Sequence, residues 1–239
     1  IMKGLSEQPL IKHLFELRTT ALRCIISITL ITIILLPFAN QIYSFIATPL
    51  IAKLPEGSSM IATEVASPFF APFKLTLFCG IFFSIPYILY QTWSFIAPGL
   101  YINERKLILP LLVSSSLLFY LGIFFAYYVV FPILFAFLTT TAPSNITVMT
   151  DINHYLDFIL KLFFAFGVSF EIPIATILLI KSNFITIEKL SSNRPYIILF
   201  AFFVGMLLTP PDVISQILLA IPIWVLFEIG LILGKYFKN

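Results

Sequence analysis

The chain has 239 residues, of which 60% are hydrophobic and only 10% charged, and its mean hydropathy is +1.05. Soluble domains carry about 25% charged residues, so this composition excludes an ordinary soluble protein and predicts an all-α integral membrane protein. The formal net charge is +3, and the two cysteines, Cys24 and Cys79, lie in separate apolar segments, which predicts neither a disulfide framework nor a metal site.

Residues 1–21 are predicted to form an amphipathic helix on the cytoplasmic surface of the membrane. Leu10, Leu14, Leu17 and Ala21 recur at a spacing that places them on one face of a helix. The apolar stretch that follows has no small-residue cleavage pattern behind it, so a cleaved signal peptide is not expected.

Six apolar stretches are predicted to be membrane helices within one polytopic domain. A helix needs about 20 residues to cross the hydrocarbon, and the first four stretches approach or exceed that length. The third is long enough that it must tilt or extend beyond the membrane. The last two are short, because the fifth ends at Thr209 and the sixth runs only from Val213 to Phe227 before Glu228 interrupts it. The predicted spans are residues 22–38, 73–97, 107–138, 158–180, 196–209 and 213–233.

The connections between these spans differ in length. The first, residues 39–72, contains Pro49 and apolar patches that predict short interfacial helices, and another connection covers residues 139–157. A tight turn between the two short spans is predicted from Pro210, Pro211 and Asp212. Asp212 would either cap the sixth helix or serve transport. The absence of an internal repeat gives no support to a transporter built from inverted repeats.

The basic residues predict that both termini lie in the cytoplasm. With this orientation, three of the fourteen basic residues fall on or near the outer side, namely Lys53, Lys74 and Lys161. The other eleven fall on the cytoplasmic side: Lys3, Lys12, Arg18, Arg23, Arg105, Lys106, Lys181, Lys189, Arg194, Lys235 and Lys238.

Glu171 lies within the apolar stretch Phe158–Pro173. Placing an acidic residue at the centre of a membrane costs about 2.5–3.5 kcal/mol on insertion scales, so a role in transport is expected, although a neutralising partner or a place at the membrane edge would also explain it. Pro173 removes the N–H that would bond the carbonyl of Ser169, which should loosen the helix beside the carboxylate. We interpret Glu171 as a polar, hydrated spot on a concave inner face.

The sequence contains no motif for common enzymatic chemistry. It has no phosphate-binding GxxxxGK[ST] loop, no GxSxG and no HExxH, and His13 and His154 are predicted on opposite sides of the membrane. We therefore expect neither an enzyme nor a cofactor. An alternative function is a small-solute or ion transporter that uses Glu171 as a proton or cation site.

Two other glutamates, Glu16 and Glu104, lie in segments predicted to face the cytoplasm. Separate carboxylates on that face would accept two guanidinium groups through charge-assisted hydrogen bonds. Alternatively, both glutamates are solvated surface charges. Glu16 would then pair with Lys12, and Glu104 would pair with the basic residues beside it.

The chain resembles the TatC family, the polytopic core of the twin-arginine protein translocase. Six motifs occur in the family's order and extend from about Pro9 to Glu228. They are His13–Arg18 (HLFELR), Ser67–Phe70 (SPFF), Tyr90–Leu100 (YQTWSFIAPGL), Glu104–Arg105 (ER), Phe166–Glu171 (FGVSFE) and Leu207–Asp212 (LLTPPD). The family's concave architecture of six helices, with both ends inside and the last two helices short, agrees with the spans predicted above.

The resemblance implies a receptor for folded precursors whose signal peptides carry paired arginines. Glu16 and Glu104 would accept the two arginines, Arg18, Leu14 and Phe95 would shape that surface, and Pro49 matches a position important in the family. One position departs from the pattern, because Thr20 stands where the family often has a basic residue.

The resemblance also implies partners and an energy source. The partners would be the single-span proteins TatA and TatB, other TatC copies and the lipid bilayer of a bacterial cytoplasmic membrane, with no nucleic acid, and transport would draw on the proton-motive force. Met206, Thr209 and Gln216 in the last hairpin would dock TatA or TatB helices, although packing within the hairpin is an alternative for the same side chains.

Overall fold

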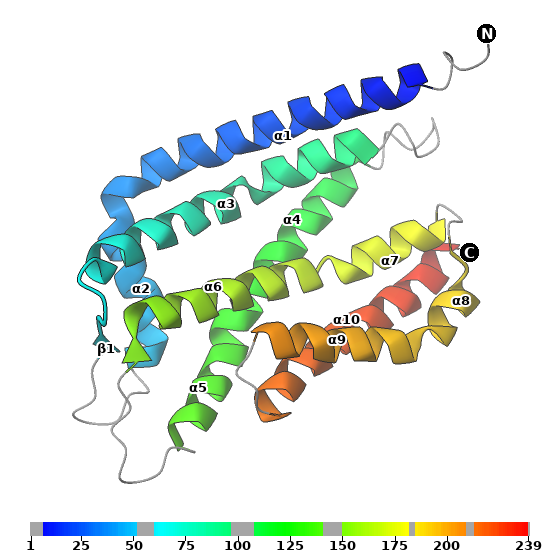
Figure 1. The fold of residues 1–239 in the computed structure, drawn as a ribbon. Coiled ribbons are helices and arrows are strands. Elements are labelled where there is room, and N and C mark those ends of the chain that lie inside the picture. Colours follow the sequence, from blue (N-terminus) through cyan, green and yellow to red (C-terminus); the bar gives the residue numbers. More distant parts are fainter. Residues whose placement is uncertain are drawn as a thin grey trace. The chain divides into compact units, whose positions relative to one another are not determined.

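A computed structural model describes residues 7–51, 60–96, 108–140, 150–181, 185–208 and 213–238 of the chain (Figure 1). Nearly all of these residues are helical, which confirms the predicted all-α class. The described residues also contain a two-residue parallel bridge between β1 (Met60–Ile61) and β2 (Thr150–Asp151). The helices are α1 (Glu7–Leu35), α2 (Ala39–Ile51), α3 (Ser67–Ile96), α4 (Ile108–Phe125), α5 (Phe131–Thr140), α6 (Ile152–Ser169), α7 (Ile172–Lys181), α8 (Ile187–Ser192), α9 (Arg194–Leu208) and α10 (Val213–Lys238).

Five helical stretches among the described residues are long and apolar enough to cross a membrane. They are Leu14–Thr48, Ser67–Phe95, Leu109–Phe137, Ile152–Lys181 and Gln216–Tyr236. A shorter apolar helix, Arg194–Leu208, accompanies them. The prediction that the fifth span is short is confirmed, while the count of six crossings and the cytoplasmic location of both ends stay predictions.

Two predicted boundaries are wrong. The sixth span was predicted to be short because Glu228 interrupts it, but α10 runs for 26 residues with Pro222 inside it. The predicted surface helix and first span form one continuous helix, α1, of 29 residues. No proline or glycine lies between Pro9 and Leu35, so nothing in that stretch forces the chain to bend where the polar residues give way to apolar ones.

Prolines account for the irregular turns inside two long helical stretches. Pro37 lies in the short 3₁₀ turn Leu36–Phe38, where α1 ends and α2 begins. Pro132 lies two residues after the end of the π-helical turn Ala126–Val130, which closes where the N–H of Phe131 bonds the carbonyl of Ala126. Because proline cannot donate to the carbonyl four residues earlier and its ring crowds that carbonyl, the helix widens locally instead of breaking.

Pro173 lies in the first turn of α7, and the helical hydrogen bonding is interrupted just before it, between α6 and α7. The N–H of Phe170 still bonds the Phe166 carbonyl at 3.0 Å, but the N–H of Glu171 bonds Val168, only three residues earlier, also at 3.0 Å. Helical bonding resumes where the N–H of Ala175 reaches the carbonyl of Glu171 at 2.9 Å. Glu171 therefore lies in the turn between two helices of one apolar stretch.

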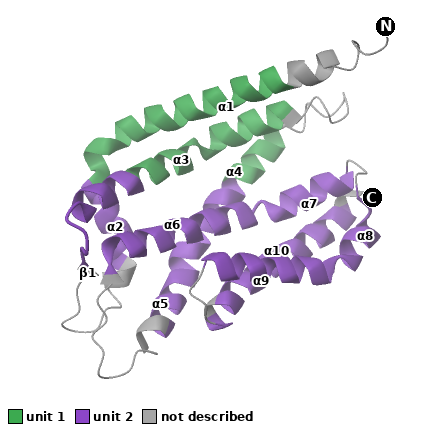
Figure 2. Cartoon of the chain, in the orientation of Figure 1, with its two compact units in different colours: residues 1–39, 76–116 green, residues 40–75, 117–239 purple. Residues whose placement is uncertain are grey.

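The chain folds as two compact units (Figure 2). Unit 1 comprises residues 1–39 and 76–116, so its main elements are α1 and most of α3, which run side by side (Figure 1). They lie close together at Gly80, where an added Cβ would overlap Thr32 Oγ1 and lie 3.3 Å from the Ile28 carbonyl oxygen. Glycine therefore permits the two helix backbones to approach.

Unit 2 comprises residues 40–75 and 117–239 and has an aromatic core. Phe131 and Phe163 stack with their ring centroids 5.2 Å apart, and Phe125 and Phe166 lie 5.6 Å apart. An added Cβ at Gly122 would lie 2.6 Å from the Phe166 carbonyl oxygen. The segments on either side of the π-helical turn thus pack tightly against α6.

Asp151 connects the start of α6 to the segment before α3, within unit 2. Its Oδ1 accepts hydrogen bonds from the N–H groups of Asn153 (2.8 Å) and His154 (3.1 Å), which caps α6. Its Oδ2 accepts from the N–H of Thr63 at 3.0 Å and from the Thr63 hydroxyl at 2.7 Å. These bonds hold the pKa of Asp151 well below its usual range, with the Thr63 hydroxyl as the largest cause.

Further polar contacts connect the same end of unit 2. Asn153 Nδ2 donates to Ser67 Oγ at 2.6 Å, and Lys74 forms an ion pair with Asp157.

The Tyr155 hydroxyl donates to the Ile46 carbonyl at 3.0 Å, and the Tyr127 hydroxyl to the Phe45 carbonyl at 3.1 Å. The first of these two tyrosines thereby ties α2 to α6, and the second ties α2 to the π-helical turn.

We predict that Gly80→Ala destabilises unit 1 by about 1–3 kcal/mol, the usual cost of overpacking. Thr32→Ala should cost less, because the Thr32 hydroxyl bonds only the Ile28 carbonyl of its own helix, at 2.8 Å. The double variant should recover part of the loss because the overlapping oxygen is gone. Thermal unfolding in detergent measures all three variants, and additive losses would contradict the packing described for Gly80.

We predict that Asp151→Asn lowers the melting temperature at neutral pH. Because folding lowers the pKa of Asp151, its contribution to stability is present above the ordinary aspartate pKa of about 3.9. That contribution is lost as the pH falls below this value towards the lowered pKa. The difference in melting temperature between wild type and variant should therefore be full at pH 6 and shrink below about pH 4. A difference that stays constant across this range would contradict the assignment.

Candidate functional site

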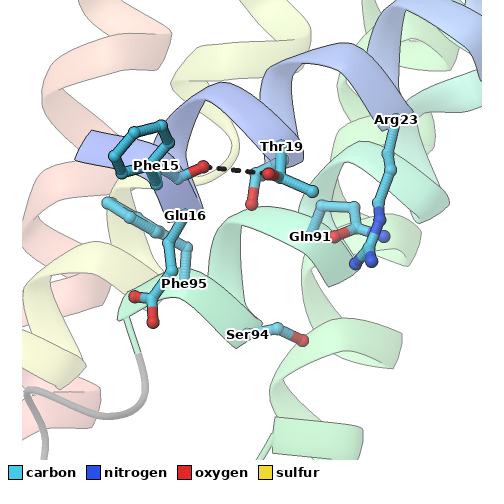
Figure 3. Close-up of a pocket in the computed structure, with 8 residues that line it drawn as sticks. Phe15, Glu16, Thr19, Arg23, Gln91, Ser94 and Phe95 are labelled. Atoms are coloured by element: carbon cyan, nitrogen blue, oxygen red, sulfur yellow. Dashed lines mark hydrogen bonds between the residues drawn. The ribbon is translucent and has the colours of Figure 1, made fainter. Parts of the chain in front are cut away.

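A pocket of about 440 Å³ lies on unit 1, between α1 and the last turns of α3 (Figure 3). Both helices contribute charged or polar groups together with one phenylalanine each. The lining residues are Phe15, Glu16, Thr19, Thr20 and Arg23 from α1 and Gln91, Ser94 and Phe95 from α3. The pocket therefore combines hydrogen-bonding groups of both charges with aromatic surface.

Glu16 and Arg23 are the two charged residues among the described lining of the pocket. They are seven residues apart on α1, almost two full turns, so they share one face of the helix and their Cα atoms lie about 10.5 Å apart along its axis. In Figure 3, the Glu16 side chain lies beside Phe95 and the Arg23 side chain extends toward Gln91. The pocket thus has an acidic and a basic end.

Gln91 provides a rigid polar wall at the basic end. Its side chain is only 7% exposed, and its Nε2 donates a 2.8 Å hydrogen bond to the Tyr87 hydroxyl one turn earlier on α3. This bond fixes the orientation of the amide. On the α1 side, the Thr19 hydroxyl donates to the Phe15 carbonyl at 2.9 Å, which anchors that side chain to its own helix.

The structure brings together two of the five residues predicted for signal-peptide binding, Glu16 and Phe95. Leu14 and Arg18 are exposed on α1 but do not line the pocket. Glu104 lies outside the described residues. Neither Arg23 nor Gln91 was predicted from the sequence to line this site. The helical spacing between Glu16 and Arg23 could have indicated that Arg23 lies on the same face of the helix as Glu16.

The residues predicted for transport lie in unit 2 or outside the described residues. Glu171 occupies the turn between α6 and α7 and is partly exposed. Pro49 lies in α2, while Asp212 is outside the described residues, so its predicted cap stays a prediction.

The residues predicted for partner docking are described in part. Met206 is 51% exposed on α9, and Thr209 lies outside the described residues. Gln216 lies on α10, close to α9, because an added Cβ at Gly205 would lie 3.3 Å from the Gln216 carbonyl oxygen. The proposed docking of other helices at this hairpin stays a prediction.

An ion pair joins the start of α9 to α10. Arg194 Nε lies 2.6 Å from Glu228 Oε1, and its Nη2 lies 2.9 Å from Oε2. This two-pronged geometry matches the planar guanidinium to both carboxylate oxygens. Glu228, which was predicted to interrupt the last span, is thus a residue that connects two helices.

Comparisons with known proteins agree on one family. The family of Sec-independent protein translocase proteins (TatC) matches residues 12–222. The Sec-independent protein translocase protein TatC of Haemophilus influenzae is 57% identical over 231 residues, which cover 97% of this chain and 90% of that protein. The TatC of Escherichia coli K12 is also 57% identical, over 230 residues that cover 96% of this chain and 89% of that protein.

One solved structure is similar to this chain along almost the whole length of both. The crystal structure of a twin-arginine translocase receptor, TatC, has a TM-score of 0.86 and 38% sequence identity. The match covers 95% of this chain and 100% of that one.

We predict that Arg194→Lys lowers the melting temperature, although it keeps the positive charge, because lysine cannot reproduce the fork. Lys189→Arg, on the neighbouring α8, is the matched control and should have no effect. Glu228→Gln should cost as much as Arg194→Lys or more. Chemical or thermal unfolding in detergent measures these changes, and a fully stable Arg194→Lys variant would contradict the role of the fork.

Proposed function

This chain belongs to the TatC family of Sec-independent protein translocase proteins, and we propose that it binds the twin-arginine signal peptides of folded precursors in the pocket between α1 and α3. The observation that supports this proposal most directly is the position of the Glu16 carboxylate at the acidic end of that pocket, beside the Phe95 ring. The family is a component of a protein translocase and not a class of enzyme.

The chemistry of the pocket suits a guanidinium group. Arginine keeps its charge at every physiological pH and presents a planar fork of donors that matches a carboxylate, whereas lysine is a point charge. An aromatic face beside the carboxylate adds favourable stacking and cation–π contact for a planar cation. Glu16 would therefore accept one arginine, and we assign the second to Glu104 by its match to the family's motif.

The remaining parts of the proposal follow from the family. The chain would assemble with TatA, TatB and further copies of itself, with both termini in the cytoplasm and as a single membrane domain, and would use the proton-motive force. The exposed Met206 supports the last hairpin as the docking surface for TatA or TatB. The approach of Gly205 to Gln216 favours the alternative for Gln216, packing within the hairpin. Glu171, at a break between two helices, is suited to a polar contact during transport.

We predict that Glu16→Gln weakens the binding of a synthetic twin-arginine signal peptide by about tenfold or more, because a charge-assisted hydrogen bond is replaced by a neutral one. Glu188→Gln, which removes an exposed carboxylate on α8 on the same predicted side, should leave affinity unchanged. Fluorescence anisotropy with the full chain in nanodiscs measures both.

A paired-lysine peptide provides the second comparison. Wild type should bind it more weakly than the paired-arginine peptide, and this preference should shrink in Glu16→Gln. If Glu16→Gln binds the twin-arginine peptide as wild type does, then Glu16 is not an arginine acceptor and the proposed site is wrong.

A further inference from the structure

We propose that the pocket between α1 and α3 also binds a membrane lipid, namely the headgroup of one phosphatidylethanolamine. Arg23 holds the phosphate, Glu16 holds the ammonium group, and the acyl chains follow α1 into the membrane. The inference goes beyond the proposed function, and the lipid binding does not depend on it. Where the proposed function holds, a signal peptide displaces this lipid when it enters the pocket.

The order of chemical groups along one face of α1 matches their order in this lipid. Glu16, Arg23 and Leu30 recur every seven residues, so they share a face of the helix. Ile26 and Ile33 lie one turn before and after Leu30, and all three apolar side chains are more than half exposed. A carboxylate, a guanidinium and an exposed apolar surface thus follow one another along α1. In the lipid, an ammonium, a phosphate and the acyl chains follow one another in the same direction.

The spacing of the two charges fits one headgroup. The Cα atoms of Glu16 and Arg23 lie about 10.5 Å apart along the helix axis, and both side chains reach from α1 towards α3 (Figure 3). With the side chains extended in parallel, two hydrogen bonds of about 3 Å leave about 4.5 Å between the two bound charges. The two-carbon bridge of ethanolamine spans such a distance, so a single headgroup reaches both ends of the pocket.

The surroundings of each charge suit the group assigned to it. Beside Glu16 lies the Phe95 ring (Figure 3), whose face attracts a cation. No hydrogen bond or ion pair involves Arg23 in the part of the chain that the structure describes, so its planar fork of donors is available to phosphate oxygens. The volume of about 440 Å³ lies within the range of pockets that bind small ligands.

The acidic end of the pocket selects ethanolamine among the common headgroups. A primary ammonium donates charge-assisted hydrogen bonds to a carboxylate, whereas the nitrogen of choline carries only methyl groups and has no proton to donate. A glycerol headgroup has no positive charge, so its lipid would bring an uncompensated negative charge towards Glu16. Arg23 alone would bind the phosphate of all three lipids, and the preference for ethanolamine therefore depends on Glu16.

The experiment is native mass spectrometry of the full chain, titrated with phosphatidylethanolamine, phosphatidylcholine or phosphatidylglycerol that carry the same acyl chains. Glu188→Gln and Lys235→Gln, which remove exposed charges from α8 and α10, are the controls. Wild type and both controls should bind phosphatidylethanolamine about fivefold more tightly than the other two lipids, as for a partly solvated ion pair. Glu16→Gln should lose this preference. Arg23→Gln should bind phosphatidylethanolamine and phosphatidylcholine about fivefold more weakly, since both carry the phosphate.

Three results would overturn the lipid site. The first is equal binding of the three lipids by wild type, and the second is a preference for phosphatidylethanolamine that survives in Glu16→Gln. The third is a preference of wild type for phosphatidylglycerol, because the pocket would then respond to net negative charge alone. Binding of phosphatidylcholine by Glu16→Gln with the affinity of wild type shows that this variant is folded.

Addition of a synthetic twin-arginine peptide separates this inference from the proposed function. Displacement of phosphatidylethanolamine by the peptide supports both. If the peptide does not bind, the proposed function fails, while a lipid preference that depends on Glu16 still stands. If the peptide binds and the lipid stays in place, the lipid lies elsewhere on the chain and its assignment to this pocket is overturned.

Discussion

A peptide group in the hydrocarbon core of a membrane has no water to bond, so each backbone N–H and C=O must find its partner within the protein. The irregular turns in the described helices follow from this constraint. Where Pro132 withdraws a donor, the chain widens into a π-helical turn, and where Pro173 does so, Glu171 bonds a carbonyl three residues back. The chain therefore tolerates proline inside apolar stretches, and the turn before Pro173 places a carboxylate where helical bonding is already interrupted.

Side-chain polar groups meet the same constraint in two ways. Several hydroxyls in the apolar helices bond the carbonyl one turn earlier, as Thr32 does with Ile28 and Ser169 with Ala165. The buried hydroxyl oxygens of Ser115 and Ser116 have no such partner among the described residues. Two pairs of charged groups instead neutralise each other, Arg194 with Glu228 and Lys74 with Asp157.

Much of the fold could be predicted from the sequence, because apolar stretches of sufficient length have few alternatives in a membrane. Boundaries were less predictable, since Glu228 was interpreted as the end of a span when Arg194 in fact neutralises it from another helix. That pairing depends on tertiary contact and leaves no local signal. For the pocket, Glu16 and Phe95 followed from family motifs, whereas Gln91 becomes significant only when Tyr87 and α1 are seen beside it.

The continuity of α1 is the correction with the largest consequence for the site. Had the chain turned between Ala21 and Leu22, where the predicted surface helix meets the first predicted span, Glu16 and Arg23 would lie on separate segments and their spacing would vary. In one unbroken helix, the backbone hydrogen bonds fix that spacing. Unit 1 then holds two opposite charges at a constant distance along a wall completed by α3, and a fixed distance between opposite charges is what allows a pocket to distinguish one ligand from another.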